Sequence, residues 1–293
     1  MRKSLLIRVF LLVAILISNS AYAEIKIGLL AKRGPEVARE RWTVLAEYLE
    51  EKLAEPVRFI PLDFTEIMDF CRKNPTQFIF ANSWFYVRAK VKQGAKALVT
   101  IKNRGSGTLF GGVIFTRKGV GVDDLRDIRG RTLACPKLSS AGGWIFQKGV
   151  MVKGGVHPTS ECKLVLQLGT HDAVVKAVRD RQVDVGTVRT NILERMHSEG
   201  KVKLSDLAVL HPVRHEGFPE LCSTPLYPTW PIASLKDTPP ELAEKLKKCL
   251  LAIPKRSVAL DPCNVEAFVE AHDYGPLEEL LRFLKVKPFD SSP

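Results

Sequence analysis

The sequence predicts an α/β protein built from two lobes that enclose a cleft. Short apolar segments alternate with helical segments along most of the chain, a pattern typical of sheets covered by helices on both faces. The alternation runs in two series, which are separated by an extended glycine-containing segment from Leu109 to Arg117. We place a crossover between the lobes at this segment, and the 293-residue chain is long enough to form both.

The N-terminal residues 1–23 have the features of a secretory signal peptide. A basic tip with Arg2 and Lys3 precedes an apolar segment from Leu5 to Ile17, and a small-residue cleavage site, Ala21-Tyr22-Ala23, follows. The apolar segment is too short for a comfortable transmembrane helix, and the sequence contains no second one. We therefore expect a soluble protein of the bacterial periplasm, and the cysteine that a lipid anchor needs does not follow the cleavage site.

The first series of elements begins directly after the leader. Its longest helix places Ala38, Trp42, Leu45 and Leu49 on one face, as helical spacing requires. The predicted elements are strand Ile25–Leu30, helix Glu36–Leu53, strand Val57–Pro61, helix Thr65–Arg72, strand Phe78–Ala81, helix Ser83–Gln93 and strand Ala97–Ile101.

The second series alternates in the same way and predicts a second lobe. Its elements are strand Thr132–Cys135, helix Ser140–Val152, strand Lys163–Leu168, helix Asp172–Arg181, strand Val183–Val188, helix Thr190–Glu199 and strand Ala208–Leu210. The segment Tyr227–Trp230 and a helix from Pro240 to Ile253 then return to the first lobe. We therefore assign residues 24–110 and 223–293 to lobe 1 and residues 111–222 to lobe 2.

The stretch from Arg131 to Val152 is the first candidate for a binding site, because it forms a strand-loop-helix corner. The first N–H groups of a helix lack backbone partners, and the helix dipole places partial positive charge there. Ser139 and Ser140 add hydroxyl donors beside the amides of Ala141 and Gly142, and the glycine pair would let a ligand approach the backbone. An anion fits this corner, although a serine before a helix is more often a plain cap.

Polar residues also follow three other predicted strands, which is where ligands of two-lobed α/β folds bind. Each of these residues alone is more often a helix cap than a ligand contact. Together with the serine loop they would converge on the cleft, and they favour an anion site there. The residues are Asn82 and Ser83, Thr170 and His171, and Arg189 and Thr190.

Charge and cysteine content narrow the classes of partner. The net charge is +12, but Lys and Arg are scattered among acidic residues and no nucleic-acid-binding motif is present, so we expect no nucleic-acid partner. No Cys/His spacing typical of zinc or haem occurs, so neither a metal nor a cofactor is predicted. The six cysteines of an exported chain permit disulfides, and Cys249 with Cys263 is the preferred pair.

Six stretches between Ile25 and about Ala252 carry a family resemblance: KIGLLAKRG, FIFANSWFYVRA, FGGVIFTRK, IRGRTLACPKLSSAGGW, GTHDAVVKAVRDRQVDVGTVRTNILERM and GFPELCSTPLYPTWPIA. In this order they resemble the phosphonate-binding family of periplasmic solute-binding proteins, within the PhnD/SsuA/transferrin-like group. The resemblance is greatest to the periplasmic sensor domains of tetrathionate-sensor-type histidine kinases.

The resemblance implies a type 2 periplasmic-binding-protein fold that holds a small anion, phosphonate-like or a sulfur or phosphorus oxyanion, in the interlobe cleft. It implies that the loop from Leu138 to Gly142 grips the anion and that His171 contacts it. It also implies that aromatic residues around Trp84 and Tyr86 line the wall opposite that loop. Further ligand contacts are expected from the last of the six stretches, at Ser223, Thr224 and Tyr227.

Two departures from the relatives bear on ligand and partner. The gripping loop reads Lys137-Leu138-Ser139-Ser140-Ala141, where phosphonate binders carry a fuller Ser/Thr run, and this leaves the identity of the anion open. The kinase relatives continue into a transmembrane helix and catalytic domains, whereas this sequence stops at Pro293. We therefore expect a monomer that serves the permease of an ABC transporter or signals to a separate sensor histidine kinase.

A secreted thiol-dependent enzyme is the alternative, because Cys135 lies beside the loop and His171 lies in the predicted cleft. No nucleophile motif surrounds Cys135, and Asp172, as the immediate neighbour of His171, would point elsewhere on a helix. A third class is an interaction module whose basic surface docks on an acidic membrane partner.

Overall fold

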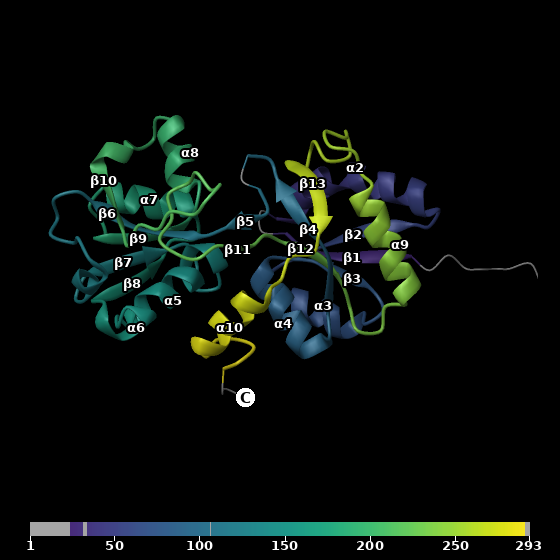
Figure 1. The fold of residues 1–293 in the computed structure, drawn as a ribbon, viewed down its shortest axis with the longest axis horizontal. Coiled ribbons are helices and arrows are strands. Elements are labelled where there is room, and N and C mark those ends of the chain that lie inside the picture. Colours follow the sequence, from purple (N-terminus) through teal and green to yellow (C-terminus); the bar gives the residue numbers. More distant parts are fainter. Residues whose placement is uncertain (1–23, 32–33, 106, 291–293) are drawn as a thin grey trace, which may run out of the picture.

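The computed structural model describes residues 24–31, 34–105 and 107–290, which form two lobes that lie side by side (Figure 1). Lobe 1 is built on a six-stranded sheet and lobe 2 on a five-stranded sheet, each flanked by helices. The predicted signal peptide lies outside the described residues. Within the described part of the chain, no helix has both the length and the apolar character that crossing a membrane requires.

The sheet of lobe 1 is mixed, with the strand order β13-β4-β12-β3-β1-β2. β1 pairs in parallel with β2 and β3, while β12 runs antiparallel to β3 and β4. The strands are β1 (Ile25–Leu30), β2 (Val57–Leu62), β3 (Phe78–Phe80), β4 (Lys96–Asn103), β12 (Pro231–Ser234) and β13 (Val265–Glu270). The helices are α2 (Pro35–Leu53), α3 (Ile67–Lys73), α4 (Ser83–Gln93), α9 (Pro240–Leu251) and α10 (Gly275–Phe283).

The sheet of lobe 2 has the order β10-β6-β9-β7-β8, with β7 parallel to β8 and β9. The strands are β6 (Gly112–Arg117), β7 (Thr132–Cys135), β8 (Leu164–Gln167), β9 (Val185–Arg189) and β10 (Leu207–Leu210). The helices are α5 (Phe146–Lys153), α6 (Pro158–Glu161), α7 (His171–Arg179) and α8 (Ile192–Ser198), with 3₁₀ turns η1 (Leu125–Ile128) and η3 (Leu204–Asp206) and a π-helical turn η2 (Ala141–Ile145).

A two-stranded antiparallel ribbon joins the lobes. It pairs β5 (Leu109–Phe110) with β11 (Tyr227–Pro228), so both crossings of the chain lie next to each other (Figure 1). The single long strand predicted from Leu109 to Arg117 is therefore divided at Gly111. A side chain at that position has no room, because its Cβ would lie 2.6 Å from the Cys222 sulfur.

The strands divide between the sheets as the two series predicted, although the exact lobe boundaries stay a prediction. One apolar core fills lobe 1, where Trp42 and Leu45 of α2 pack on the sheet, and another fills lobe 2 around Val174 and Val178 of α7. A third apolar cluster contains residues of both lobes together with Leu277, Leu280 and Leu281 of α10. The C-terminal helix α10 thus packs against α4 of lobe 1 and α5 of lobe 2.

The helix predicted from Ser140 to Val152 has a different start in the structure. Its first turn is π-helical, and the amide of Phe146 donates to the carbonyl of Ala141, five residues earlier. Such turns are rare and frequently occur at functional sites. The sequence prediction also omitted β12, β13 and α10, all in the last quarter of the chain.

Candidate functional site

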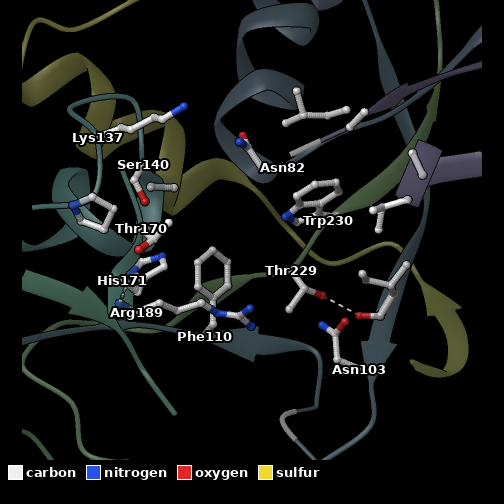
Figure 2. A pocket seen from close by; sticks show the side chains of 18 of the residues that line it. Asn82, Asn103, Phe110, Lys137, Ser140, Thr170, His171, Arg189, Thr229 and Trp230 are labelled. Carbon is white, nitrogen blue, oxygen red and sulfur yellow. Dashed lines mark hydrogen bonds between the residues drawn. The ribbon is translucent and has the colours of Figure 1, made fainter. Parts of the chain in front are cut away.

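A cavity of about 860 Å³ lies between the lobes, at the carboxyl ends of β1, β3, β7 and β9 (Figure 2). Lobe 2 contributes the loop before η2, the start of α7 and the end of β9. Lobe 1 contributes residues of β1 and α2 and the segment around Trp230. A second cavity of about 540 Å³ continues it and shares Arg41, Arg189 and Arg195.

The serine loop of lobe 2 presents backbone amides to this cavity. Ser140 caps η2, because its hydroxyl oxygen accepts from the amide of Gly143 at 3.1 Å. Its own amide donates to the carbonyl of Lys137 at 2.9 Å, which closes the loop into a turn. The amides of Ala141 and Gly142 keep no partner among the described residues. They are therefore available to an acceptor in the cavity.

Two polar side chains fix the orientation of this turn from inside lobe 2. The amide nitrogen of Gln147 donates to the carbonyls of Gly142 and Val188, at 2.7 Å each. The hydroxyl of Thr187 donates to the carbonyl of Gly143 at 2.6 Å. With its carbonyls held by the body of the lobe, the turn has its orientation set before a ligand arrives.

The glycine pair makes room for neighbouring side chains. A Cβ at Gly142 would lie 2.8 Å from the ring of Phe110, and a Cβ at Gly143 would lie 2.8 Å from Cε1 of His171. Neither glycine has a positive φ, so space and not backbone conformation requires them. The expectation that they let a ligand approach the backbone stays a prediction.

His171 begins α7 and lies against the end of β9. Its Nδ1 accepts from the backbone amide of Arg189 at 3.3 Å, so in the neutral ring the proton is on Nε2. Thr170 caps the same helix by accepting from the amide of Ala173 at 3.1 Å. The ring of His171 faces the cavity beside Ser140 (Figure 2).

Arg189 places a guanidinium at the floor of the cavity, and no carboxylate of the described residues forms an ion pair with it. The guanidinium carbon lies 4.7 Å from the centre of the Phe110 ring, and its Nε is buried with no hydrogen-bond partner. Burial lowers the pKa of Arg189 to about 10, and the partly opposing influence of Glu220 is too weak to restore it. The group is still cationic at neutral pH, and a buried cation that forms no ion pair among the described residues is costly.

Other charged side chains make the cavity net positive. Lys137 takes part in no ion pair within the described residues, and its Nζ lies 5.0 Å from the ring of Phe64 across the cleft. Arg41 donates to the carbonyls of Pro262 and Cys263, at 3.2 and 2.5 Å, which leaves its charge uncompensated. Among the described residues that line the cavity, Arg195 alone of the cations pairs with carboxylates, those of Asp172 and Glu199.

The sequence matches, over residues 27–274, the family described as "ABC transporter, phosphonate, periplasmic substrate-binding protein". The chain belongs to this phosphonate-binding family of periplasmic substrate-binding proteins. The resemblance inferred from the sequence is therefore confirmed, and so is the type 2 periplasmic-binding-protein fold.

The chain is also similar to part of a sensor kinase. The tetrathionate sensor histidine kinase TtrS of Salmonella typhimurium is 28% identical over 233 residues, which are 78% of this chain and 39% of the kinase. This chain thus spans about two-fifths of the length of that relative.

Two solved structures share the fold at low identity. PhnD1 of Prochlorococcus marinus, in complex with methylphosphonate, is 18% identical with a TM-score of 0.67, over 89% of this chain and 98% of its own. XAC2383 of Xanthomonas citri, bound to ATP, is 17% identical with a TM-score of 0.71, over 89% and 98% of the two chains.

In this member of the family, the cavity brings together seven of the thirteen residues predicted as ligand contacts. Another, Thr190, lines the adjoining cavity instead. The seven are Asn82, Ser139, Ser140, Ala141, Gly142, His171 and Arg189.

Trp84 and Tyr86 of α4 lie away from the cavity, and both contact the C-terminal segment. The indole nitrogen of Trp84 donates to the carbonyl of Lys287 at 2.7 Å. The hydroxyl of Tyr86 accepts from the amide of Ala97 at 3.2 Å, and its ring packs on Tyr274. Both are buried core residues, and only Asn82, at the start of the helix, lines the cavity.

Ser223, Thr224 and Tyr227 also lie outside the cavity, in the crossing segment. The hydroxyls of Ser223 and Thr224 accept from the amides of Ile114 and Gly112, at 3.0 and 2.9 Å, in place of strand pairing. The ring of Tyr227 packs on Phe146 with 4.2 Å between centroids. These three residues attach the segment that returns from lobe 2 to lobe 1 to the strand β6 and the helix α5.

The sequence reasoning missed most of the lobe 1 side of the cavity. The apolar residues concerned have the spacing of ordinary core positions, so no periodic signal separates them from the interior. Trp230 is the exception, since an aromatic residue directly after a strand-like segment can point into a cleft. The missed residues are Val37, Arg41, Trp42, Phe64, Phe80, Ile101, Asn103, Phe110, Thr229 and Trp230.

The cysteines form neither the predicted disulfide nor a catalytic pair. All six are free thiols, and the thiol of Cys263 donates to the carbonyl of Arg41 at 2.8 Å. Cys135 is fully buried, and burial raises the pKa of its thiol to about 12, which opposes thiolate formation. It does not line the cavity with His171. Within the described residues, no cluster of three or more His, Cys, Asp or Glu side chains could hold a metal ion.

Proposed function

We propose that this protein captures a small anionic solute in its interlobe cleft and presents it to a membrane partner. The observation that carries the proposal is Arg189, a cation enclosed at the cavity floor with no carboxylate bound to it. An anion placed there would meet the guanidinium, the amides of Ala141 and Gly142, and the hydroxyl of Ser140. Hydrogen bonds to charged groups of this kind are roughly twice as strong as neutral ones.

Methylphosphonate and ATP, which two proteins of the same fold hold, are both phosphorus-containing anions, and this supports the class of solute. The partner is either the permease of an ABC transporter, as in the description of the family, or a sensor kinase, as in the similar TtrS. The thiol-enzyme alternative has no support from geometry, because Cys135 is buried away from the cavity.

A thermal-shift panel of anions tests the proposal. Phosphate, sulfate, methylphosphonate, tetrathionate and ATP are added to the wild-type protein and to Arg189→Gln. A ligand at a hundredfold excess over its dissociation constant stabilises the folded state by about 2.7 kcal/mol, and we expect this with the wild type but not with Arg189→Gln. Arg214→Gln is the matched control, because Arg214 is exposed and does not line the cavity.

Two results would contradict the proposal. One is that no anion stabilises the wild type while native mass spectrometry shows an empty cleft. The other is that Arg189→Gln responds to the same anion as strongly as the wild type and Arg214→Gln do.

A further inference from the structure

A group of charged side chains lies unsatisfied behind the cleft. Within the described residues, five buried side-chain atoms have no hydrogen-bond partner, and three of them belong to Arg189, Glu194 and Glu220. The atoms are Nε of the arginine and one carboxyl oxygen, Oε2, of each glutamate. Buried polar groups are nearly always paired in proteins, so three such atoms on interacting charges require a physical explanation.

The three side chains come from three separate elements. Arg189 ends β9, Glu194 lies on α8, and Glu220 lies in the loop that follows β10. Figure 2 shows the guanidinium of Arg189 extending into the cavity. Neither Glu194 nor Glu220 is among the described residues that line the two cavities. The glutamates therefore act on a ligand through Arg189 and not by contact.

One hydrogen bond brings the two glutamates into the same region. The Oε1 of Glu194 accepts from the amide of Leu221 at 2.5 Å, and Leu221 directly follows Glu220. The two Oε2 oxygens can only accept when both groups are ionised, and no donor of the described residues reaches either. A single proton removes the conflict, because a protonated carboxyl group donates a hydrogen bond while an ionised one accepts it.

The surroundings of Glu220 favour its protonated form. Burial raises the pKa of its carboxyl group, and the negative charge of Glu194 on α8 raises it further. The backbone amide of Glu220 itself and the positive charge of Arg189 on β9 lower the pKa, but they offset only part of this effect. A proton therefore stays on Glu220 at a pH at which an ordinary glutamate is ionised.

Histidines are the other side chains near the site that titrate between pH 5 and pH 8. His211 and His215, in the same loop as Glu220, each contact a backbone carbonyl through one ring nitrogen, at 3.2 and 2.8 Å. His171 lines the cavity, and its Nδ1 accepts from the amide of Arg189. Protonation of that nitrogen would remove the bond. His171 is nevertheless the competing source of any pH dependence, and the experiment has to separate it from Glu220.

A bound anion and the proton on Glu220 stabilise each other. In its ionised form, Glu220 offsets part of the charge that Arg189 presents to the cavity. An anion at Arg189 adds negative charge nearby, which disfavours ionised Glu220 and raises its pKa further. Because linkage is reciprocal, protonation of Glu220 strengthens the binding of the anion by the same factor. Affinity therefore rises as the pH falls through the pKa of Glu220 and is constant well above and well below it.

We propose that Glu220 is a positioning residue for Arg189, and that capture of the anion is coupled to the uptake of a proton which Glu220 shares with Glu194. The inference rests on the proposed function and adds the regulation of that site by pH. The protein accordingly holds its solute more tightly in an acidic medium than in a neutral one.

Calorimetric titration at pH 5 and pH 8 tests the coupling. The probes are sulfate and tetrathionate, whose charge does not change in this range, and methylphosphonate, whose own titration cancels when two protein variants are compared. For the wild type we expect the dissociation constant to be about tenfold lower at pH 5, which corresponds to a difference of about one pKa unit between the free and bound forms. Titrations at intermediate pH, in two buffers with different ionisation enthalpies, should show an uptake of about half a proton per anion.

Variants assign the proton to the two glutamates. Glu220→Gln should lose the dependence on pH and bind about as tightly as the wild type does at pH 5, because glutamine resembles the protonated group. Glu216→Gln is the matched control and should keep the tenfold change, since Glu216 is exposed in the same loop and does not line the cavity. Glu194→Gln keeps an acceptor for the amide of Leu221 and should reduce the proton uptake. It provides the test if Glu220→Gln does not fold.

The outcomes separate this inference from the proposed function. Equal affinity of the wild type at both pH values, without proton uptake, overturns the coupling while anion capture stands. A pH dependence that survives unchanged in Glu220→Gln and Glu194→Gln also overturns it and assigns the proton to His171. Absence of binding by all three anions at both pH values contradicts the proposed function and the coupling together.

Discussion

Ser140 serves the fold and the site with the same hydroxyl. Its oxygen accepts from the amide of Gly143, and its hydrogen is left to donate to a ligand. We expect Ser140→Ala to lower the free energy of unfolding by about 1 kcal/mol, the usual value of a cap. Loss of a hydrogen bond to a charged group, about 1.5–3 kcal/mol, should also raise the dissociation constant of the anion roughly tenfold to a hundredfold.

Denaturant unfolding and calorimetric titration measure the two effects separately. Ser160→Ala is the control, because the Ser160 hydroxyl makes only an exposed bond to the carbonyl of His157. If Ser140→Ala loses stability but binds with unchanged affinity, the serine is a cap and nothing more.

The cysteines give a second prediction at the scale of residues. Because all six are free, thiol titration of the denatured, unreduced protein should find six groups per chain. In the folded protein Cys135 should stay unmodified at pH 8, since burial raises the pKa of its thiol to about 12 and encloses it. Peptide mapping after alkylation measures this, and fewer than six groups in the denatured chain would restore the disulfide hypothesis.

At the scale of elements, α10 links the lobes, and its contact with α5 of lobe 2 requires a glycine on α5. A Cβ at Gly149 of α5 would lie 2.4 Å from Cδ1 of Leu280. We expect Gly149→Leu to displace α10 from lobe 2 and to destabilise the protein by about 1–3 kcal/mol, the usual cost of overpacking. The matched comparison is the double variant Gly149→Leu with Leu280→Ala, which removes the obstructing side chain.

Denaturant unfolding of the single and double variants gives the coupling between the two positions. Residues in contact typically show a coupling of about 0.5–3 kcal/mol. Additive losses of stability would show that α10 does not rest on α5 through this contact.

The sequence predicted local elements better than it predicted the site. The strand Thr132–Cys135 and the helix Ser83–Gln93 match β7 and α4 residue for residue, because apolar spacing and a cap are local signals. The π-helical turn η2 was missed, since contacts of Gln147 and Thr187 with its carbonyls hold it and these come from tertiary structure. For the same reason a buried aromatic such as Trp84 could not be distinguished from a cleft aromatic such as Trp230.

At the scale of the whole molecule, the prediction is that the lobes close around the solute. Only the ribbon of β5 and β11 connects them as chain, and the aromatic residues Phe110 and Tyr227 pair across it. Asn82 and Trp230 face the serine loop and Arg189 from the opposite lobe. A ligand that touches both walls binds the closed form better, and only this difference in affinity can shift the balance between open and closed forms.

Small-angle scattering measures the closure. The radius of gyration of the wild type should fall when the anion that stabilises it most in the thermal-shift panel is added to saturation, while Arg214→Gln should behave like the wild type. Arg189→Gln at the same ligand concentration should keep the radius of the free protein, because it loses the contact that the closed form offers. A radius that stays constant at saturation would show that the lobes do not close. The helix α10 would then be the element that keeps them apart, because it packs on both lobes. In that case a membrane partner could not read occupancy from the distance between the lobes, and the signal would have to lie in the cleft surface itself.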